Sequence, residues 1–140
     1  MITEDWNEEL GLAQCVVTDI SNGVILSGYG RAACHDDDIP WKRASTGKYI
    51  AMTRAQIDIL KKKRDYELKP SIMAIEHIIS TMTNSKKYNP DSYEAKRIKK
   101  ELKNLKDDLH MINTIIKDEQ ASLKTYLDAK DKLHKEAENK

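Results

Sequence analysis

From Leu10 onward the chain alternates between apolar and polar positions, as a half-buried β-strand does. Two such runs lie on either side of Asn22-Gly23. Asn-Gly between strand-forming runs indicates a tight hairpin, because its type I′ turn requires a positive φ at both central residues. The pattern therefore predicts an antiparallel β-hairpin, followed by a loop, over residues 10–45.

Pairing outward from this turn places mainly small side chains on one face, as expected where a helix lies close against a sheet. That face holds Ala13, Cys15, Val17, Leu26, Gly28, Gly30 and Ala32. The opposite face holds Val16, Ile20, Ile25, Tyr29 and Arg31. A two-stranded hairpin is marginal in water, and its second face is still partly apolar. We therefore expect a second copy of the chain to supply strands or a cover.

From about residue 46 the apolar period becomes that of a helix, with a start near Ser45 or Thr46. The seam positions of the first stretch recur at spacings of four and three: Leu68, Ile72, Ile75, Ile79 and Met82. Pro70 should kink this stretch and move Lys69 away from helical dihedral angles. Residues 1–9, by contrast, are acidic without a clear period, so we expect a loose arm that Trp6 could dock.

A turn is predicted near residues 86–91, with Asn89 as N-cap and Pro90 in the first turn of a last helix that ends near Ala137. Its seam comprises Ile98, Leu102, Leu105, Leu109, Ile112, Ile116 and Leu123. Two arms of similar length joined by a short turn predict a long antiparallel helical hairpin over residues 46–140. Met73, Ala74 and Ile78 widen the first arm's apolar face beyond one partner helix. The predicted fold is therefore α+β and homo-oligomeric, as a dimer or a larger assembly.

Charge is distributed unevenly along the chain, although its formal net value is only +1. Residues 1–45 carry eight acidic and three basic residues, whereas residues 46–90 carry four acidic and nine basic residues. An electrostatic partner should therefore contact the helices. The acidic N-terminal residues lack the basic segment and following apolar segment of a signal peptide. No apolar run reaches the roughly 18 residues of a membrane span. We expect a cytoplasmic protein without a membrane partner, in the host cytoplasm if the chain is viral.

No set of residues predicts catalysis. The four histidines lie on different elements, and no nucleophile, base and orienting acid can be grouped. The run from Cys34 to Asp38 could suggest a metal site, but adjacent ligands point in different directions, so a solvated acidic loop is favoured. We therefore predict a protein that is not an enzyme and that has no metal and no cofactor.

Basic residues suggest an anion site. Arg54, Lys61 and Arg64 fall beside the apolar seam, where either their stems pack with the charges in water, or the charges line a groove. Further cations follow Lys86, Lys87 and Tyr88 at the helical turn: Lys96, Arg97, Lys99, Lys100, Lys103 and Lys106. Cations beside an aromatic ring and the Asn89 amide suit a nucleotide. The stripe is short, so binding to extended nucleic acid is disfavoured.

Two linked motifs carry a family resemblance: Gly30-x-Ala32-x-Cys34-x-x-Asp37-Asp38 and Gly47-x-x-x-Ala51-x-x-Arg54-Ala55. Over about residues 13–60 the chain resembles the viral anti-Thoeris sponges. That family sequesters cyclic ADP-ribose signals, made by bacterial TIR enzymes, in pockets between the protomers of a homo-oligomer. The resemblance implies that Arg54 matches the motif arginine, that Tyr88 and Asn89 match a ligand-gripping aromatic and amide, and that Lys106 and His110 match the basic pair.

The leading hypothesis is a phage-encoded protein that sequesters a small anionic cyclic nucleotide without turnover and so counters bacterial defence. Its candidate ligand contacts are Arg31, Arg54, Tyr88, Asn89, Lys103, Lys106 and His110. One alternative is a coiled-coil adaptor or inhibitor that binds another protein through residues 70–84. A second alternative is an RNA-associated or ribosome-associated module.

Overall fold

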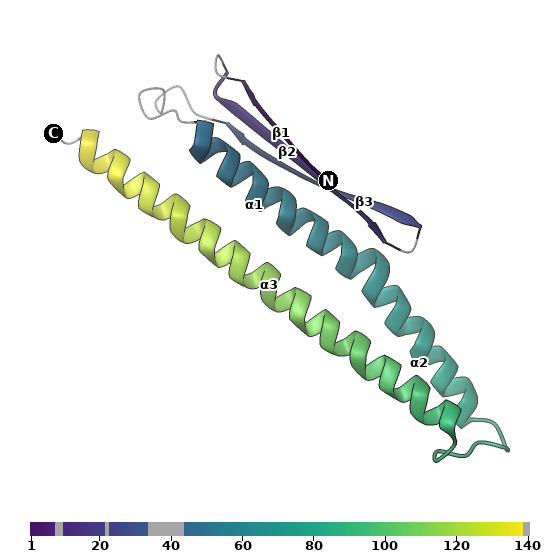
Figure 1. Cartoon of the computed structure of the whole chain (residues 1–140). Helices are drawn as coiled ribbons and strands as arrows, with labels where there is room; N and C mark the ends of the chain where they lie inside the picture. Colours follow the sequence, from purple (N-terminus) through teal and green to yellow (C-terminus); the bar gives the residue numbers. More distant parts are fainter. Residues whose placement is uncertain (8–9, 22, 34–43, 139–140) are drawn as a thin grey trace. The chain divides into compact units, whose positions relative to one another are not determined.

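A computed structural model describes residues 1–7, 10–21, 23–33 and 44–138. It is an α+β protein, in which a three-stranded antiparallel sheet precedes the helices (Figure 1). The strands are β1 (Ile2–Asn7), β2 (Leu12–Ser21) and β3 (Val24–Ala33). The helices are α1 (Ala44–Lys63), the π-helix η2 (Arg64–Leu68), α2 (Lys69–Thr83) and α3 (Tyr93–Glu138).

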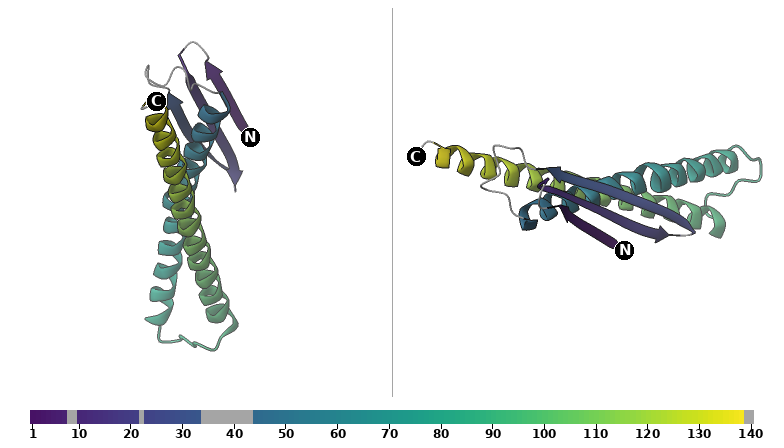
Figure 2. Two further views of the ribbon diagram at one scale, coloured as in Figure 1. Left: turned by 90° about the vertical axis from the view of Figure 1, so that its left-hand side faces the viewer. Right: turned by 90° about the horizontal axis from the view of Figure 1, so that it is seen from above.

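The chain divides into two compact units. One comprises Met1–Lys61 with Ile115–Lys140, and the other comprises Lys62–Thr114. The first unit contains the sheet, and Figure 2 shows its three strands from two further sides. None of the helices in the described part of the chain is both long and apolar enough to cross a bilayer.

The loose arm predicted for residues 1–9 is wrong, because Ile2–Asn7 form the edge strand β1. This strand pairs antiparallel with β2, and Met1 exchanges two backbone hydrogen bonds of 2.8 Å with Thr18. The chain can return tightly because Gly11 adopts a φ of 60°. The acidic side chains of this strand remain exposed at the edge of the sheet, where charge is tolerated.

The predicted hairpin and its register are confirmed. Ser21 pairs with Val24, and the pairing continues through Cys15 with Gly30 and Ala13 with Ala32. Gly23 has a φ of 76°, as this type of tight turn demands. Asn22 lies outside the described residues, as do residues 34–43 of the predicted loop.

The small-residue face of the sheet packs directly against α1. A Cβ atom on Gly30 would meet the backbone oxygen of Ala51, and one on Gly28 would lie 2.6 Å from the backbone nitrogen of Ile59. Ala51 is fully buried. Trp6 lies over Gly47 at the start of the same helix, where an added Cβ would come 2.7 Å from its ring. Glycine and alanine therefore allow the helix and strands to approach more closely than larger residues would permit.

The second part of α3 packs with α1 in the same unit. The rings of Tyr49 and Tyr126 lie 4.8 Å apart, centroid to centroid, in a tilted arrangement. Ile116 and Leu123, both predicted seam residues, are buried. The side chains of α3 therefore cover α1 on a face that does not contact the sheet.

The helix does not break before Pro70, which corrects the prediction for Lys69. This residue keeps helical dihedral angles of −62° and −46°, and its N–H donates to the backbone oxygen of Arg64. That bond spans five residues, as in a π-helix, and widens the turn that precedes the proline. The wider turn relieves the clash between the proline ring and the carbonyl group four residues earlier, so the chain stays helical.

The last helix begins later than predicted, and its N-cap is Ser92 rather than Asn89. The Ser92 hydroxyl oxygen accepts a hydrogen bond of 3.2 Å from the N–H of Ala95, which is the capping geometry. The Asn89 side-chain oxygen instead accepts the N–H of Asp91 at 3.0 Å and forms a local turn. Both residue types favour such local bonds, and here the cap belongs to Ser92.

Within Lys62–Thr114 the two helical segments run antiparallel, as predicted for this part of the hairpin. Near one end Arg64 donates to the Asn113 side-chain oxygen at 3.3 Å. Near the other end, Ile79 on α2 and Ile98 on α3 line the same hollow. Met73 on α2 remains 72% exposed, so part of the apolar surface predicted for the first arm is uncovered.

Candidate functional site

The predicted ligand contacts fall in two groups. Arg31 and Arg54 belong to the unit that contains the sheet. The remaining five belong to Lys62–Thr114: Tyr88, Asn89, Lys103, Lys106 and His110.

Arg54 binds the outer edge of β3. Its Nη1 atom donates to the backbone oxygen of Arg31 at 2.6 Å. One turn later on α1, the carboxylate of Asp58 accepts the backbone N–H of Tyr29 at 2.8 Å. Main-chain groups of alternate residues point to this edge, so two helix side chains replace the bonds that a further strand would make. Arg54 keeps four of its five N–H donors for other partners.

Replacing Asp58 with alanine is expected to destabilise the protein by about 1–2 kcal/mol, because a charged acceptor would be lost from a backbone N–H. Urea unfolding, followed by far-ultraviolet circular dichroism, would measure the change. Asp128 on α3 is exposed, and its replacement by alanine provides the matched control. Equal stability of the two variants would contradict the edge-capping role.

Tyr88 and Lys99 meet at the turn between α2 and α3. The Lys99 ammonium nitrogen lies 5.7 Å from the centroid of the Tyr88 ring, within the range of a cation–π contact. The ring is half-buried and stands over apolar side chains. The hollow there is lined by Ile79, Met82, Tyr88, Ala95, Ile98 and Lys99. An aromatic ring thus lies next to a positive charge at this turn.

A row of cations leads away from this ring along α3. Lys99, Lys103, Lys106 and His110 follow one another at spacings of four, three and four, which places them on one face of the helix. All four are exposed. Each follows a seam residue directly, so the row flanks the helix–helix contact. Lys99 was not among the predicted ligand contacts, although its contact with the Tyr88 ring distinguishes it from the neighbouring lysines.

Basic residues greatly outnumber acidic ones around this turn. Eight basic and three acidic residues lie between Lys86 and Lys106. In the described part of the chain, none of these eight cations has a carboxylate oxygen within 4.0 Å. Asn89 is exposed and uses its side-chain oxygen in the local turn, which leaves its NH2 group to donate elsewhere. This turn is therefore a positive surface that carries an aromatic ring and an amide donor.

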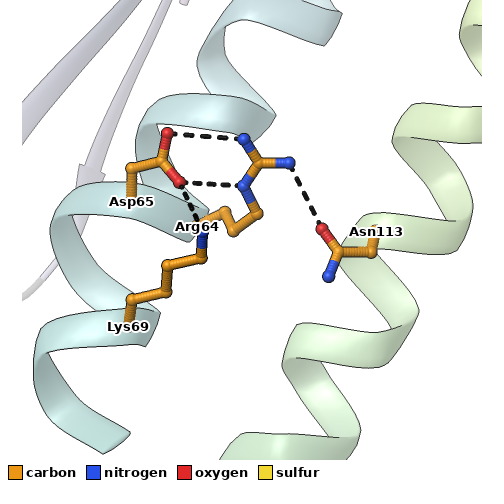
Figure 3. Close-up of polar contacts among 4 residues, drawn as sticks. All are labelled: Arg64, Asp65, Lys69 and Asn113. Carbon is orange, nitrogen blue, oxygen red and sulfur yellow. Dashed lines mark hydrogen bonds and ion pairs between the residues drawn. The ribbon is translucent and has the colours of Figure 1, made fainter. Parts of the chain in front are cut away.

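Arg64 differs from these cations, because it already has a carboxylate partner. It forms two contacts with the adjacent Asp65, at 2.8 and 3.4 Å, and Lys69 contacts the same carboxylate at 3.4 Å (Figure 3). The hydrogen bond from Arg64 lowers the pKa of Asp65 and raises that of Arg64 itself. Arg64 therefore links η2 to α3 and has less capacity for a free anion.

Two hollows in the described residues are small. The hollow at Tyr88 encloses about 160 Å³, and a second one, between Gly11, Ala33, Gly47 and Lys130, encloses about 270 Å³, open solvent included. Pockets for small molecules typically measure about 300–1,000 Å³. A nucleotide at either place would therefore lie partly on open surface, or would need a further wall.

Other candidate chemistry is limited in the described residues. Burial, together with the charge of Glu4, raises the pKa of the Cys15 thiol, so the thiol stays protonated at neutral pH and packs as an apolar group. The run from Cys34 to Asp38, considered as a metal site, lies outside the described residues. Within the described ranges, no group of three or more His, Cys, Asp or Glu side chains is arranged to hold a metal ion.

In comparisons with known proteins, no family model, no curated protein and no solved structure matches this chain.

Proposed function

We propose that this chain is a binding protein, not an enzyme, that sequesters a small anionic nucleotide of the cyclic ADP-ribose type. Its setting would be the cytoplasm of a phage-infected bacterium, where removal of the signal counters host defence. The observation that carries the proposal is the row of cations without carboxylate partners beside the Tyr88 ring. The motif resemblance around Arg54 supports the ligand class.

Binding at this surface follows from ordinary contacts. Phosphate oxygens accept charge-assisted hydrogen bonds from Lys99, Lys103 and Lys106, which are stronger than neutral ones. A base stacks on the Tyr88 ring and displaces the Lys99 ammonium toward the phosphates. The NH2 group of Asn89 donates to the base edge, and His110 extends the row of donors. None of these steps breaks a bond, so the ligand is held intact.

A second copy of the chain would supply the missing wall. The hollow at Tyr88 is too small for a nucleotide, so a site confined to one copy leaves much of the ligand in water. A ligand between protomers is desolvated on both sides, which strengthens each charged contact. Arg31 and Arg54 remain candidate contacts through the motif resemblance.

A thermal-shift titration tests the proposal. Cyclic ADP-ribose isomers at about 100 times their dissociation constant should stabilise the fold by about 2.7 kcal/mol, since they bind the folded state alone. Such a gain raises the unfolding midpoint by several degrees. Linear ADP-ribose and 3′,5′-cyclic nucleotides serve as comparison ligands. Chromatography of the released ligand should recover it unchanged, and an unmoved midpoint with every ligand would refute the proposal.

A second candidate function is a coiled-coil adaptor that binds another protein through α2. The specific observation is the exposure of Met73 (72%) and Ile78 (46%) on a helix with only one acidic residue. Exposed apolar side chains on such a helix suit a partner helix. Replacing both residues with glutamine should then abolish capture of that partner but leave nucleotide stabilisation unchanged. If a nucleotide stabilises the protein and no protein partner is captured, the sequestering function is favoured over the adaptor.

A further inference from the structure

The sheet has an outer face that no described element covers. Side chains alternate across a strand, so the residues between those packed on α1 point the other way. On this outer face Ile20 is 70% exposed, Ile25 is 66% exposed and Tyr29 is 49% exposed. Val16 and Leu12 lie on the same face. A partly apolar sheet face normally packs against another layer about 10 Å away.

The two edges of this outer face differ in size and charge. Strand pairing aligns Thr3 with Val16 and Tyr29 in one row. The next row aligns Asp5 with Gln14 and Arg31. In these two rows the β1 side therefore carries the small Thr3 and the acidic Asp5, whereas the β3 side carries the large Tyr29 and the basic Arg31. Such a face is complementary to itself when its two edges are exchanged.

We propose that two copies of the chain pack these outer faces together, around a two-fold axis that runs along β2. This rotation exchanges the edges, so β1 of one copy lies over β3 of the other. Asp5 then faces Arg31 of the second copy, and the symmetry repeats the pair. Thr3 faces Tyr29 of the second copy, which sets a small residue against a large one. Val16 faces its own counterpart at the centre.

A second copy fits this face better than an added strand does. At the outer edge of β3, the backbone groups of Tyr29 and Arg31 are already bound by Asp58 and Arg54, so a further strand cannot use them there. Asp5 and Arg31 lie on opposite edges of the same face, so each can pair with the other residue of a second copy. A face that contacts its own equivalent in this way forms an isologous interface. This interface does not depend on ligand binding. It can therefore be tested by measuring the mass of the protein in solution without ligand.

Charge reversal tests the interface. Light scattering should give the unmodified protein a mass of at least twice the 16.1 kDa of one chain. Asp5→Arg and Arg31→Asp should each halve that mass and raise the dissociation constant about 100-fold or more, because each creates two like-charge pairs. The double variant, with both charges exchanged, should restore the mass. Both side chains are exposed, and circular dichroism checks that the fold is retained.

Asp128→Arg, on the exposed surface of α3, is the matched control and should leave the mass unchanged. A single-chain mass for the unmodified protein would overturn the proposal. The same holds if both single variants keep the original mass. A double variant that stays dissociated would overturn the two-fold packing.

Discussion

Replacement of Gly30 with alanine is expected to lower the free energy of unfolding by about 3 kcal/mol or more, at the upper end of overpacking effects. The new Cβ would meet the backbone oxygen of Ala51, which belongs to a regular helix. A helical backbone cannot yield as the end of a flexible side chain can. Relief therefore requires α1 to move away from the sheet, which opens the neighbouring contact of Gly28 with Ala55 and Ile59 on the same face.

Urea unfolding, monitored by far-ultraviolet circular dichroism, would measure this loss. Gly23→Ala is the matched control, because no atom lies within 4 Å of its added Cβ. Its cost should come only from the φ of 76° and amount to about 1–2 kcal/mol. If the two variants lose the same stability, close approach of the helix and strand is not what requires glycine at position 30.

Combined replacement of Lys99, Lys103 and Lys106 with alanine is expected to weaken nucleotide binding at least about 100-fold, since each charge-assisted hydrogen bond contributes about 1.5–3 kcal/mol. The three lysines are exposed and lie on one face of α3. Their replacement should therefore leave the unfolding midpoint of the free protein within about a degree, as surface substitutions usually do. Isothermal titration calorimetry with the best ligand of the thermal-shift titration would measure the loss.

A triple variant elsewhere on α3 supplies the control. Lys117, Lys124 and Lys132 are exposed lysines on the same helix, and their replacement with alanine removes the same formal charge. If nucleotide affinity falls equally in both variants, the loss is explained by the change in net charge. That result would contradict a specific site. If the first variant instead loses salt-dependent RNA binding, the same cations serve an RNA-associated module.

Several features could be predicted because their causes are local. The Asn22-Gly23 sequence predicts the register that β2 and β3 adopt, and the alternation around it identifies the face that packs on α1. The spacing of Ile72, Ile116 and Leu123 identifies buried helix positions without knowledge of their partners. Clustering of cations, an aromatic ring and an amide near one turn pointed to the candidates around Tyr88, whereas the motif resemblance pointed to Arg54 and His110.

Other features depend on partners that lie far away in the sequence. The acidic segment Ile2–Asn7 is a strand because β2 offers it an edge, and its own composition gave no sign of that pairing. The capping of β3 by Arg54 and Asp58 requires α1 to lie beside a particular strand edge. Lys99 is distinguished from its neighbours only by its position over Tyr88.

Turn chemistry and side-chain period act over a few residues, so the amino-acid sequence was enough to predict the two hairpin strands, their register, the helices and the apolar seams. Which edges and faces meet, and that Ile2–Asn7 form a strand, became clear from the folded structure, since those contacts join segments that are remote along the chain. The region before Pro70 illustrates the difference: the proline predicts a disturbed helix, and in the folded chain a wider π-helical turn lets the helix continue.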